Sequence, residues 1–196
     1  MSALRLGSAD PAALEVRISP MRRRHLRAVL RIEAQVYPRP WSFGLFVSEL
    51  GQRVSRCYVV AHVGRTLVGY AGMLDSVGDG HITNVAVDPA WHRHHIGTRL
   101  LLVLASEGRV RGLHNLTLEV RVSNHGAQAL YRRFGFVPAG IRKDYYPETP
   151  EDALIMWAHD IDQAPYAQRL EAIAATLPGR TRLEGVAGTP PAPGDP

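Results

Sequence analysis

Apolar and polar residues alternate in several short stretches of the chain, and this period of two predicts β-strands. In NLTLEVRV, residues 115–122, aliphatic side chains take the even positions and polar ones the odd positions, so one face of the strand is buried. Dense β-branched and aromatic content supports strands elsewhere. We expect strands at residues 14–19, 57–63, 67–75, 81–88, 115–122, 136–142 and 153–160.

Other stretches place apolar residues three or four positions apart, which predicts amphipathic helices. Pro20 is a favourable first helical position, and the prolines of YPRPWS, residues 37–42, end this first helix because proline donates no main-chain hydrogen bond. Ser42 can cap a second helix, which ends near Gly51. We expect helices at residues 21–37, 43–50, 97–112 and 123–135, and a short one at residues 166–177.

The order of these elements predicts a mixed α/β fold, with one sheet covered by helices on both faces. A chain of 196 residues is long enough for one domain with a substantial core. We expect a flexible arm at residues 1–13, the domain at residues 14–162 and a tail at residues 163–196. In that tail, the short helix precedes a Pro/Gly-rich segment whose composition predicts disorder.

The formal net charge of +5 favours anionic partners, either nucleic acid or a phosphorylated cofactor. The chain has no basic stripe interleaved with aromatic residues, which is the pattern that would favour nucleic acid. We therefore expect no direct contact with nucleic acid. The single cysteine, Cys57, lies in an apolar run and predicts a buried thiol in a reducing compartment. We find no export signal or membrane span and expect a cytoplasmic protein.

The turn DPAWHRHHIGT, residues 88–98, joins a predicted strand to an apolar helix. The main-chain N–H groups of residues 93–98 are therefore free donors at the positive end of a helix dipole, which is an arrangement that binds phosphate. Arg93 adds a guanidinium, and Gly97 lets a ligand approach the backbone closely. The turn predicts a pyrophosphate site, although an ordinary helix start has the same local sequence features.

Three histidines in this turn, His92, His94 and His95, raise the alternative of a metal site. Zinc sites in proteins usually combine histidine with cysteine or carboxylate ligands at defined spacing, and none is near these residues in the sequence. Adjacent side chains at His94 and His95 would also point apart on a helix. We therefore expect no metal.

Several motifs occur together in a fixed order: YPRPWS, NVAVDPAWHRHHIGTRLL, LEVRVSNHGAQALYRRFGF and IRKDYYPETPEDALIM. With this set, the chain resembles the RimI-type N-terminal protein acetyltransferases of the GNAT superfamily over residues 15–160. The resemblance implies the GNAT acyl-CoA N-acyltransferase fold. Its sheet is mostly antiparallel and splays between the fourth and fifth strands, beyond a β-bulge, to admit acetyl-CoA.

The resemblance also implies a cofactor site in that gap. The backbone of three residues of the fourth strand would pair with the pantetheine arm, and a main-chain N–H there would polarise the thioester carbonyl. The turn would hold the pyrophosphate, and Asn124 would contact the cofactor or serve as a helix cap. The implied residues are Val85, Ala86, Val87, Arg93, His94, His95, Ile96, Gly97, Thr98 and Asn124.

One departure from the family pattern lies in the turn. His92 and His95 stand where the family has Gln or Arg and then Gly, and only Gly97 is retained. The side chain of His95 must therefore point away from the phosphates or form a hydrogen bond to them. Protonated histidines could strengthen phosphate binding, so the departure is compatible with a substitution of one anion-binding group by another.

By the same resemblance, Glu119 is the general base, acting through water, and Tyr131 protonates the departing thiolate. From the residues alone, Glu119 could equally be a surface glutamate paired with Arg121, and Tyr131 could be a packing residue. Aromatic residues in loops would form the walls of the groove that receives the peptide, or would only anchor those loops. They are Tyr37, Trp41, Tyr145 and Tyr146.

These observations predict an enzyme that transfers acetyl from acetyl-CoA to a protein α-amine, by direct attack in a ternary complex. The resemblance implies a small-subunit ribosomal protein with an N-terminal alanine as the partner. Two alternatives stay open. One is a GNAT enzyme for a small amine or a lysine side chain, and the other is a non-catalytic module that binds acyl-CoA or nucleic acid.

Overall fold

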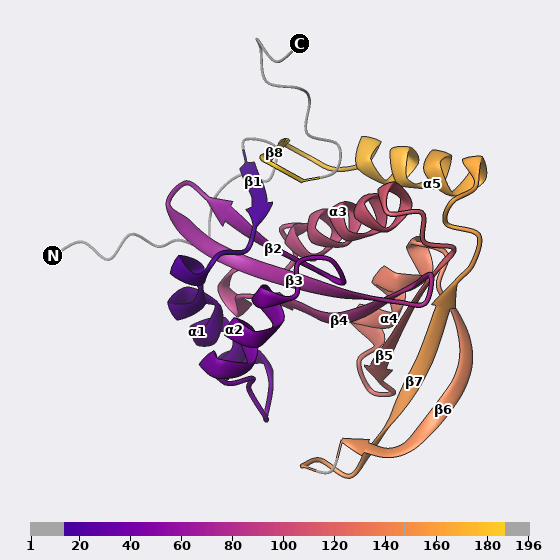
Figure 1. Cartoon of the computed structure of the whole chain (residues 1–196), viewed down its shortest axis with the longest axis horizontal. Coiled ribbons are helices and arrows are strands. Elements are labelled where there is room, and N and C mark those ends of the chain that lie inside the picture. The colour runs from indigo at the N-terminus through magenta and orange to yellow at the C-terminus, as the bar shows by residue number, and fades with distance from the viewer. Residues whose placement is uncertain (1–13, 147, 187–196) are drawn as a thin grey trace, which may run out of the picture.

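A computed structural model describes residues 14–146 and 148–186 of the chain, and eight strands in them form a single sheet (Figure 1). The strands are β1 (Glu15–Pro20), β2 (Arg56–Val63), β3 (Thr66–Ser76), β4 (Asp79–Val87), β5 (Asn115–Arg121), β6 (Val137–Tyr146), β7 (Glu151–Ala158) and β8 (Arg180–Leu183). Their order across the sheet is β6-β7-β5-β4-β3-β2-β1-β8.

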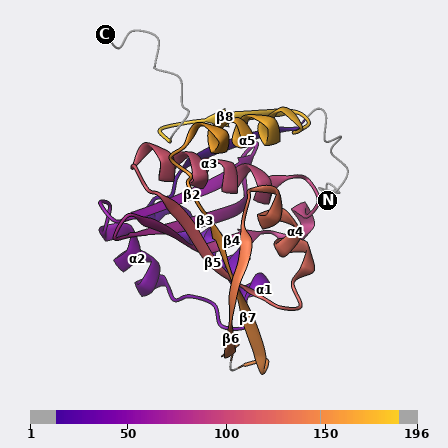
Figure 2. The ribbon, with the colours of Figure 1, turned by 90° about the vertical axis from the view of Figure 1, so that its right-hand side faces the viewer.

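Helices cover both faces of this sheet, as predicted (Figures 1 and 2). They are α1 (Leu26–Val36), α2 (Phe43–Gly51), α3 (Ile96–Val110), α4 (His125–Arg133) and α5 (Ala164–Ala175). The apolar side chains of α1 and α2 pack on one face and those of α3 and α4 on the other, where α5 also contributes to the core. The resulting mixed α/β architecture confirms the predicted fold class.

The sheet opens between β4 and β5. These two strands run parallel and pair only from Asp79↔Asn115 to His81↔Thr117. Just beyond, the register of β3 and β4 shifts so that Thr83 is left without a partner in β3, which is a β-bulge. Five other strand pairs among the described residues are antiparallel. These observations confirm the predicted sheet, which is mostly antiparallel and opens between the fourth and fifth strands beyond a β-bulge.

The first helix begins later than predicted. Strand pairing continues past Pro20, because the main-chain N–H of Met21 donates to Tyr58 O at 2.8 Å. A 3₁₀ turn, Arg23–His25, follows, and α1 starts at Leu26. The fixed φ of proline is compatible with the end of a strand as well as with a helix start, so tertiary pairing decided between them.

Two predicted loop residues belong to a strand. β6 extends to Tyr146, so Tyr145 and Tyr146 lie in the β6–β7 hairpin and not in a loop. The register shifts between Arg142 and Tyr146, and Asp144 has a left-handed φ of 49° in that interval. The irregularity weakens the alternation from which strands are predicted. Figures 1 and 2 show this hairpin projecting beyond the rest of the sheet.

The predicted disorder after residue 177 is wrong for the residues that the structure describes. β8 pairs in parallel with β1, from Glu15↔Arg180 to Ile18↔Leu183. The guanidinium of the fully buried Arg99 donates to the hydroxyl of Thr181 and to the carbonyl of Pro178, which fixes this segment against α3. The predicted arm, residues 1–13, and residues 187–196 lie outside the described part of the chain. Within that part, no helix has the length and apolar character that crossing a bilayer requires.

Candidate active site

The edge of β4 that faces the opening carries main-chain N–H groups from which no described residue accepts a hydrogen bond. The N–H of Asp88 donates to Val68 O in β3 at 2.9 Å, and backbone groups alternate along a strand, so Ala86 also faces β3 whereas Val85 and Val87 face the opening. The predicted backbone contacts with pantetheine are therefore confined to Val85 and Val87, because those of Ala86 are used within the sheet. Two side chains reach this edge: the hydroxyl of Tyr37 donates to Val85 O at 3.4 Å, and the Nε2 of His92 lies 3.1 Å from Val87 O.

The turn before α3 has the geometry of an anion site. The first helical hydrogen bond of α3 runs from the Arg99 N–H to His95 O at 3.1 Å, and none of the described residues accepts from the N–H groups of residues 93–98. Arg93 and His95 have left-handed φ values of 65° and 59°. Successive N–H donors in such a turn form a concave anion-binding surface at a positive helix end. This geometry fits a pyrophosphate.

The three histidines of the turn make separate contacts. The ring of His92 approaches Val87 O, and the Nδ1 of His94 lies 2.9 Å from His92 O. Burial lowers the pKa of His95, and the neighbouring charges of Arg99, Arg133 and His94 lower it further, so the neutral form of His95 is favoured near pH 7. Protonation of His95 is therefore not a strong source of phosphate affinity. No group of side chains suited to hold a metal occurs in the described residues.

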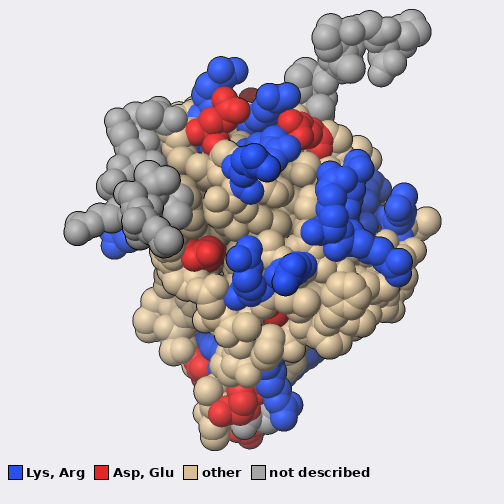
Figure 3. Space-filling model, turned by 90° about the vertical axis from the view of Figure 1, so that its left-hand side faces the viewer, with Lys and Arg blue, Asp and Glu red and all other residues tan. Residues whose placement is uncertain are grey.

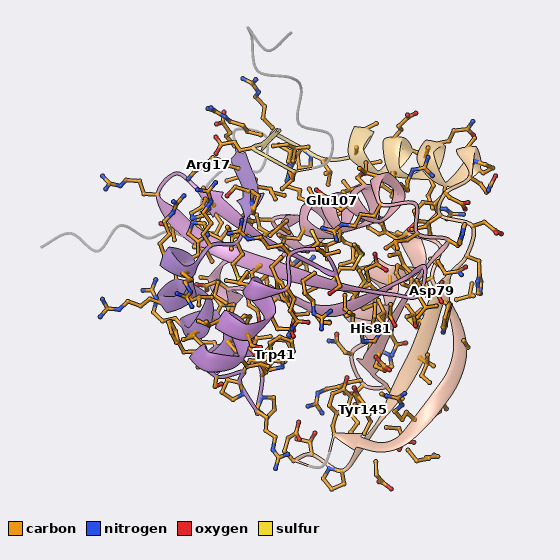
Figure 4. The ribbon with its side chains drawn as sticks, viewed as in Figure 1. Arg17, Trp41, Asp79, His81, Glu107 and Tyr145 are labelled. Atoms are coloured by element: carbon orange, nitrogen blue, oxygen red, sulfur yellow. The ribbon has the colours of Figure 1, made fainter. Side chains whose placement is uncertain are left out.

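Glu119 lies where the two strands separate. It is two residues beyond Thr117, the last residue of β5 that pairs with β4, and its side chain is only 11% exposed. One carboxylate oxygen lies 3.2 Å from the Nε2 of His81, and the other lies 3.1 Å from an Nη of Arg142. Figure 4 shows His81, Trp41 and Tyr145 around this opening. The alternative pairing of Glu119 with Arg121 does not occur.

Tyr131 reaches the same opening from α4. It is buried, its ring lies 5.8 Å from that of Phe136, and no described residue forms a hydrogen bond with its hydroxyl. Burial raises its pKa, and the nearby Tyr146 raises it further. The raised pKa of Tyr37 is due first to burial and then to Tyr131 and Glu33, so these phenols lie within electrostatic range of one another. Tyr131 therefore stays protonated at neutral pH.

A buried carboxyl that was not predicted supports the Tyr37–Trp41 loop. Glu33 is fully buried in α1 and accepts a hydrogen bond from the main-chain N–H of Trp41 at 2.9 Å and another from the hydroxyl of Tyr70. Burial raises the pKa of Glu33 to about 7. A single acid at a position that shares the helical period of Leu26 and Val29 is the sequence signal that could have identified it.

The β6–β7 hairpin is held by Arg121, another residue whose role was not predicted. Its guanidinium contacts Glu148 and Glu151, each at 3.0 Å, and lies 3.8 Å from the centre of the Tyr146 ring. The rings of Tyr145 and Tyr146 lie 5.0 Å apart, edge to face. Both predicted aromatic residues of β6 therefore stand on a rigid support beside the opening, opposite the Tyr37–Trp41 loop.

Asn124 is a helix cap, which was one of its two predicted roles. Its side-chain oxygen accepts from the Ala127 N–H at 3.1 Å, at the first turn of α4. The buried Gln128 completes this junction by donating to Arg121 O and Val122 O. Contact of Asn124 with the cofactor stays a prediction.

Cys57 has no role as a nucleophile in this arrangement. It is buried in β2, and burial raises the pKa of its thiol to about 12, so the thiol is protonated at neutral pH. Because the thiolate is the reactive form, a covalent acyl-cysteine intermediate at Cys57 is not favoured. The predicted buried thiol is confirmed.

A sheet opened between two parallel strands, a turn with free N–H donors before a helix, and a carboxylate and a phenol near the opening are the arrangement expected of an acyl-CoA-dependent acyltransferase. The Acetyltransferase (GNAT) family matches residues 26–136, more than half of the chain. The chain therefore belongs to the GNAT family of acetyltransferases, and acetyl-CoA is its acetyl donor.

Two curated relatives and one crystal structure are similar over most of the chain. The putative ribosomal protein bS18-alanine N-acetyltransferase of Bacillus subtilis (strain 168) is 39% identical over 137 residues, which are 70% of this chain and 91% of the relative. The ribosomal protein bS18-alanine N-acetyltransferase of Escherichia coli (strain K12) is 38% identical over 141 residues, 71% of this chain and 94% of the relative. The crystal structure of the ribosomal-protein-S18-alanine N-acetyltransferase from Escherichia coli superposes with a TM-score of 0.68 at 35% identity, covering 74% of this chain and 94% of that one.

Proposed function

We propose that this protein acetylates the N-terminal α-amine of a ribosomal protein, with the alanine of bS18 as the substrate. The relatives from Bacillus subtilis and Escherichia coli bear names with this activity, and the chain covers more than nine tenths of each. The observation that carries the proposal is the position of Glu119 at the mouth of the β4–β5 opening, held by His81 and Arg142.

Glu119 is the general base of the proposed mechanism. An α-amine has a pKa of about 7.7 to 8.0, so much of it is ammonium near neutral pH and must lose a proton before it attacks. The carboxylate of Glu119 accepts this proton through an intervening water. Contacts with His81 and Arg142 fix the orientation of the carboxylate and leave lone pairs on its oxygens for that water.

Tyr131 is the general acid. The attack of the amine expels a thiolate, and a protonated phenol next to the sulfur can neutralise it. Burial keeps the Tyr131 hydroxyl in its protonated form, as this role requires. Because the pKa of Cys57 is strongly raised, direct attack in a ternary complex is favoured over an acyl-enzyme.

Two groups of residues hold acetyl-CoA, which supplies the activated acetyl thioester. The N–H groups of residues 93–98 and the guanidinium of Arg93 would receive the pyrophosphate, and the main-chain N–H groups of Val85 and Val87, which have no acceptor among the described residues, would pair with the pantetheine arm. Both sets of groups face the same opening, so a ligand that spans them presents its thioester to Glu119 and Tyr131.

The peptide enters on the side of Tyr37 and Trp41, facing Tyr145 and Tyr146. Aromatic walls with fixed supports restrict the path of an extended N-terminus and favour a small first residue such as alanine. We place this reaction in the cytoplasm, where ribosomal proteins are made.

A peptide assay tests the proposal. The protein is incubated with acetyl-CoA and a peptide that has the N-terminal sequence of the organism's own bS18, beginning with alanine, and mass spectrometry locates the new acetyl group. The control is the same peptide with a blocked α-amine and an added lysine. We expect acetylation of the free α-amine alone. Acetylation of the lysine instead, or binding of acetyl-CoA without a product, would contradict the proposal and favour one of the alternative functions.

A further inference from the structure

A basic hollow of about 810 Å³ lies away from the active site, between β1, the turn that follows it and the β2–β3 turn. Four arginines line it, and one glutamate is the sole acidic residue among its described lining residues. The charged and imidazole residues are Arg17, Arg22, Arg24, Arg65, Glu184, His25 and His62.

Most of this positive charge has no acidic partner. Glu184 is shared between Arg17 at 3.4 Å and Arg182 at 3.1 Å. Arg22, Arg24 and Arg65 are exposed and form no ion pair with any described residue. An arginine group without counter-charges produces a positive potential that attracts anions.

A second hollow, of about 930 Å³, continues the basic surface and shares Pro20, Arg22 and Gly185 with the first. It adds Arg23 and Arg53, which also lack an ion pair within the described residues. Two further arginines in it are paired with glutamates. We call Arg22, Arg23, Arg24, Arg53 and Arg65, taken together, the arginine surface.

Neighbouring histidines respond to this charge. Burial, together with the nearby His62, Arg24, Arg22 and Arg17, lowers the pKa of His25 to about 4. Figure 3, which faces this side of the molecule, shows basic side chains in several groups with fewer acidic ones between them. The charge of the surface is therefore that of its guanidinium groups, and it persists throughout the neutral range.

We propose that the arginine surface binds the phosphate backbone of a double-stranded nucleic acid. Guanidinium groups form two parallel hydrogen bonds with phosphate, and a concave surface with several of them can contact successive phosphates. From the sequence we expected no nucleic-acid contact, because its basic residues form no stripe interleaved with aromatic residues. In the structure, Arg65 lines the first hollow with Arg22 and Arg24, and Arg53 lines the second with Arg22 and Arg23.

Other anionic partners fit the surface less well. A membrane-binding surface usually carries large apolar side chains that insert among the lipids, and none of the exposed ones in the described residues lines either hollow. A single-stranded nucleic acid is usually held by exposed aromatic rings, and the one aromatic ring other than histidine in these linings, that of Tyr58, is buried. Backbone contacts with a duplex require neither feature.

The surface and the active site can work at the same time. In Figure 4, Arg17 lies at the upper left of the molecule, whereas His81 and Tyr145 lie around the opening on the other side. A duplex bound near Arg17 therefore leaves the β6–β7 hairpin and the Tyr37–Trp41 loop accessible. The proposal does not depend on the peptide substrate, so it can fail or succeed independently of the proposed function.

Fluorescence anisotropy with the full-length chain and a labelled 16-base-pair duplex, as RNA and as DNA, tests the proposal. The test variant combines Arg24→Glu with Arg65→Gln. The control variant combines Arg169→Glu with Gln168→Glu in α5, which changes the net charge equally at exposed residues of another face. We expect the test variant to bind at least ~10-fold more weakly and to lose about two units of the slope of log K against log salt, while the control stays within ~2-fold.

Binding of acetyl-CoA and the thermal unfolding transition, which both variants should retain as in the wild type, verify that they fold without relying on the peptide substrate. The proposal is overturned if the wild type binds neither duplex with a salt dependence, or if the control variant weakens binding as much as the test variant. It is also overturned if the test variant loses binding only to phosphatidylglycerol vesicles or to polyglutamate. Loss of binding to either duplex in the test variant alone supports it.

Discussion

Glu119 is held from two sides by groups that come from different strands, His81 in β4 and Arg142 in β6. A carboxylate fixed in this way needs little reorganisation when it accepts a proton, which is a property of effective general bases. Its oxygens also lie next to the opening, because β4 and β5 cease to pair two residues earlier. The position and the restraint of this one side chain support the general-base role that we propose for it.

The Glu119→Gln variant should lower kcat by about 10²-fold or more at pH 7, because general-base catalysis typically contributes 10² to 10⁴-fold. The defect should shrink at pH 9, where the peptide amine is already deprotonated. Steady-state kinetics at both pH values provide the measurement, with Glu171→Gln on the exposed face of α5 as the control. An equal loss at both pH values would indicate a structural role instead.

The Tyr131→Phe variant should lower kcat by about 10-fold or more while acetyl-CoA still binds, because the phenol acts on the leaving thiolate. Tyr166→Phe is a matched control: Tyr166 is also buried, and its hydroxyl has no hydrogen-bond partner in the described structure. Kinetics and isothermal titration calorimetry with acetyl-CoA separate the two effects. If both tyrosine variants were equally active, Tyr131 would be a packing residue.

The motifs that carry the family resemblance are local in the chain, and they point to Glu119 and Tyr131 as proposed site residues. They do not reveal the residues that contact Glu119 or support the neighbouring loop. His81, Arg142 and Glu33 act through contacts that depend on strand order and on the packing of α1, and no local period encodes those. For the same reason the sequence did not reveal that Glu119 contacts His81 and Arg142 in two other strands, in place of the alternative pairing with its near neighbour Arg121.

At the scale of elements, β8 and α5 both pack against α3. The buried guanidinium of Arg99 has no acidic partner among the described residues and donates instead to Thr181 and to Pro178 O. Its Nε–H is buried and has no acceptor among the described residues. Because the buried charge of Arg99 is compensated only by neutral acceptors, each of these hydrogen bonds contributes to the stability of the fold.

The Thr181→Val variant should lower the free energy of unfolding by about 1 kcal/mol, because the buried guanidinium of Arg99 loses the hydroxyl of the exposed Thr181 as an acceptor. Thr176→Val is the control, because Thr176 accepts from the exposed Arg133 at 3.3 Å. Urea unfolding of both variants gives the comparison. Equal stability of the two variants would mean that β8 does not support Arg99.

Element boundaries were predicted well where local features decide them. Ser42 caps α2 through the Leu45 N–H at 3.2 Å, and Gly135, with a φ of 83°, follows the end of α4, as expected. β8 was missed because four residues in a Pro/Gly-rich stretch carry little pattern, and its parallel pairing with β1 joins distant parts of the chain. Propensity alone does not reveal such an element.

For the molecule as a whole, Glu33 makes the stability of the fold depend on pH. Its folded-state pKa of about 7 lies above the ordinary value of 4.5, so the folded protein binds the proton more tightly than the unfolded chain does. The stabilising contribution of the proton is complete below pH 4.5 and is lost as the pH rises through about 7. Ionised Glu33 is a buried charge whose neighbours are neutral donors.

The Glu33→Gln variant should therefore gain stability relative to the wild type as the pH rises from 5 to 8, by on the order of 3 kcal/mol. Urea unfolding of both proteins at the two pH values measures this difference. The lowered pKa values of His25 and His62 act in the opposite direction, but they are common to both proteins and cancel. A difference that does not change with pH would show that Glu33 is not ionised in this range.

The main-chain N–H groups that Val85 and Val87 present to the opening have no acceptor among the described residues. These N–H groups lie inside the narrow opening between β4 and β5. A thin, flexible chain that contains amide groups can reach them there, but a β-strand of another protein molecule cannot easily enter. The sheet thus remains incomplete without offering a template for aggregation. Amide hydrogen exchange at Val85 and Val87 should slow when CoA occupies this opening. The pantetheine arm of CoA then accepts hydrogen bonds from β4 as a neighbouring strand would.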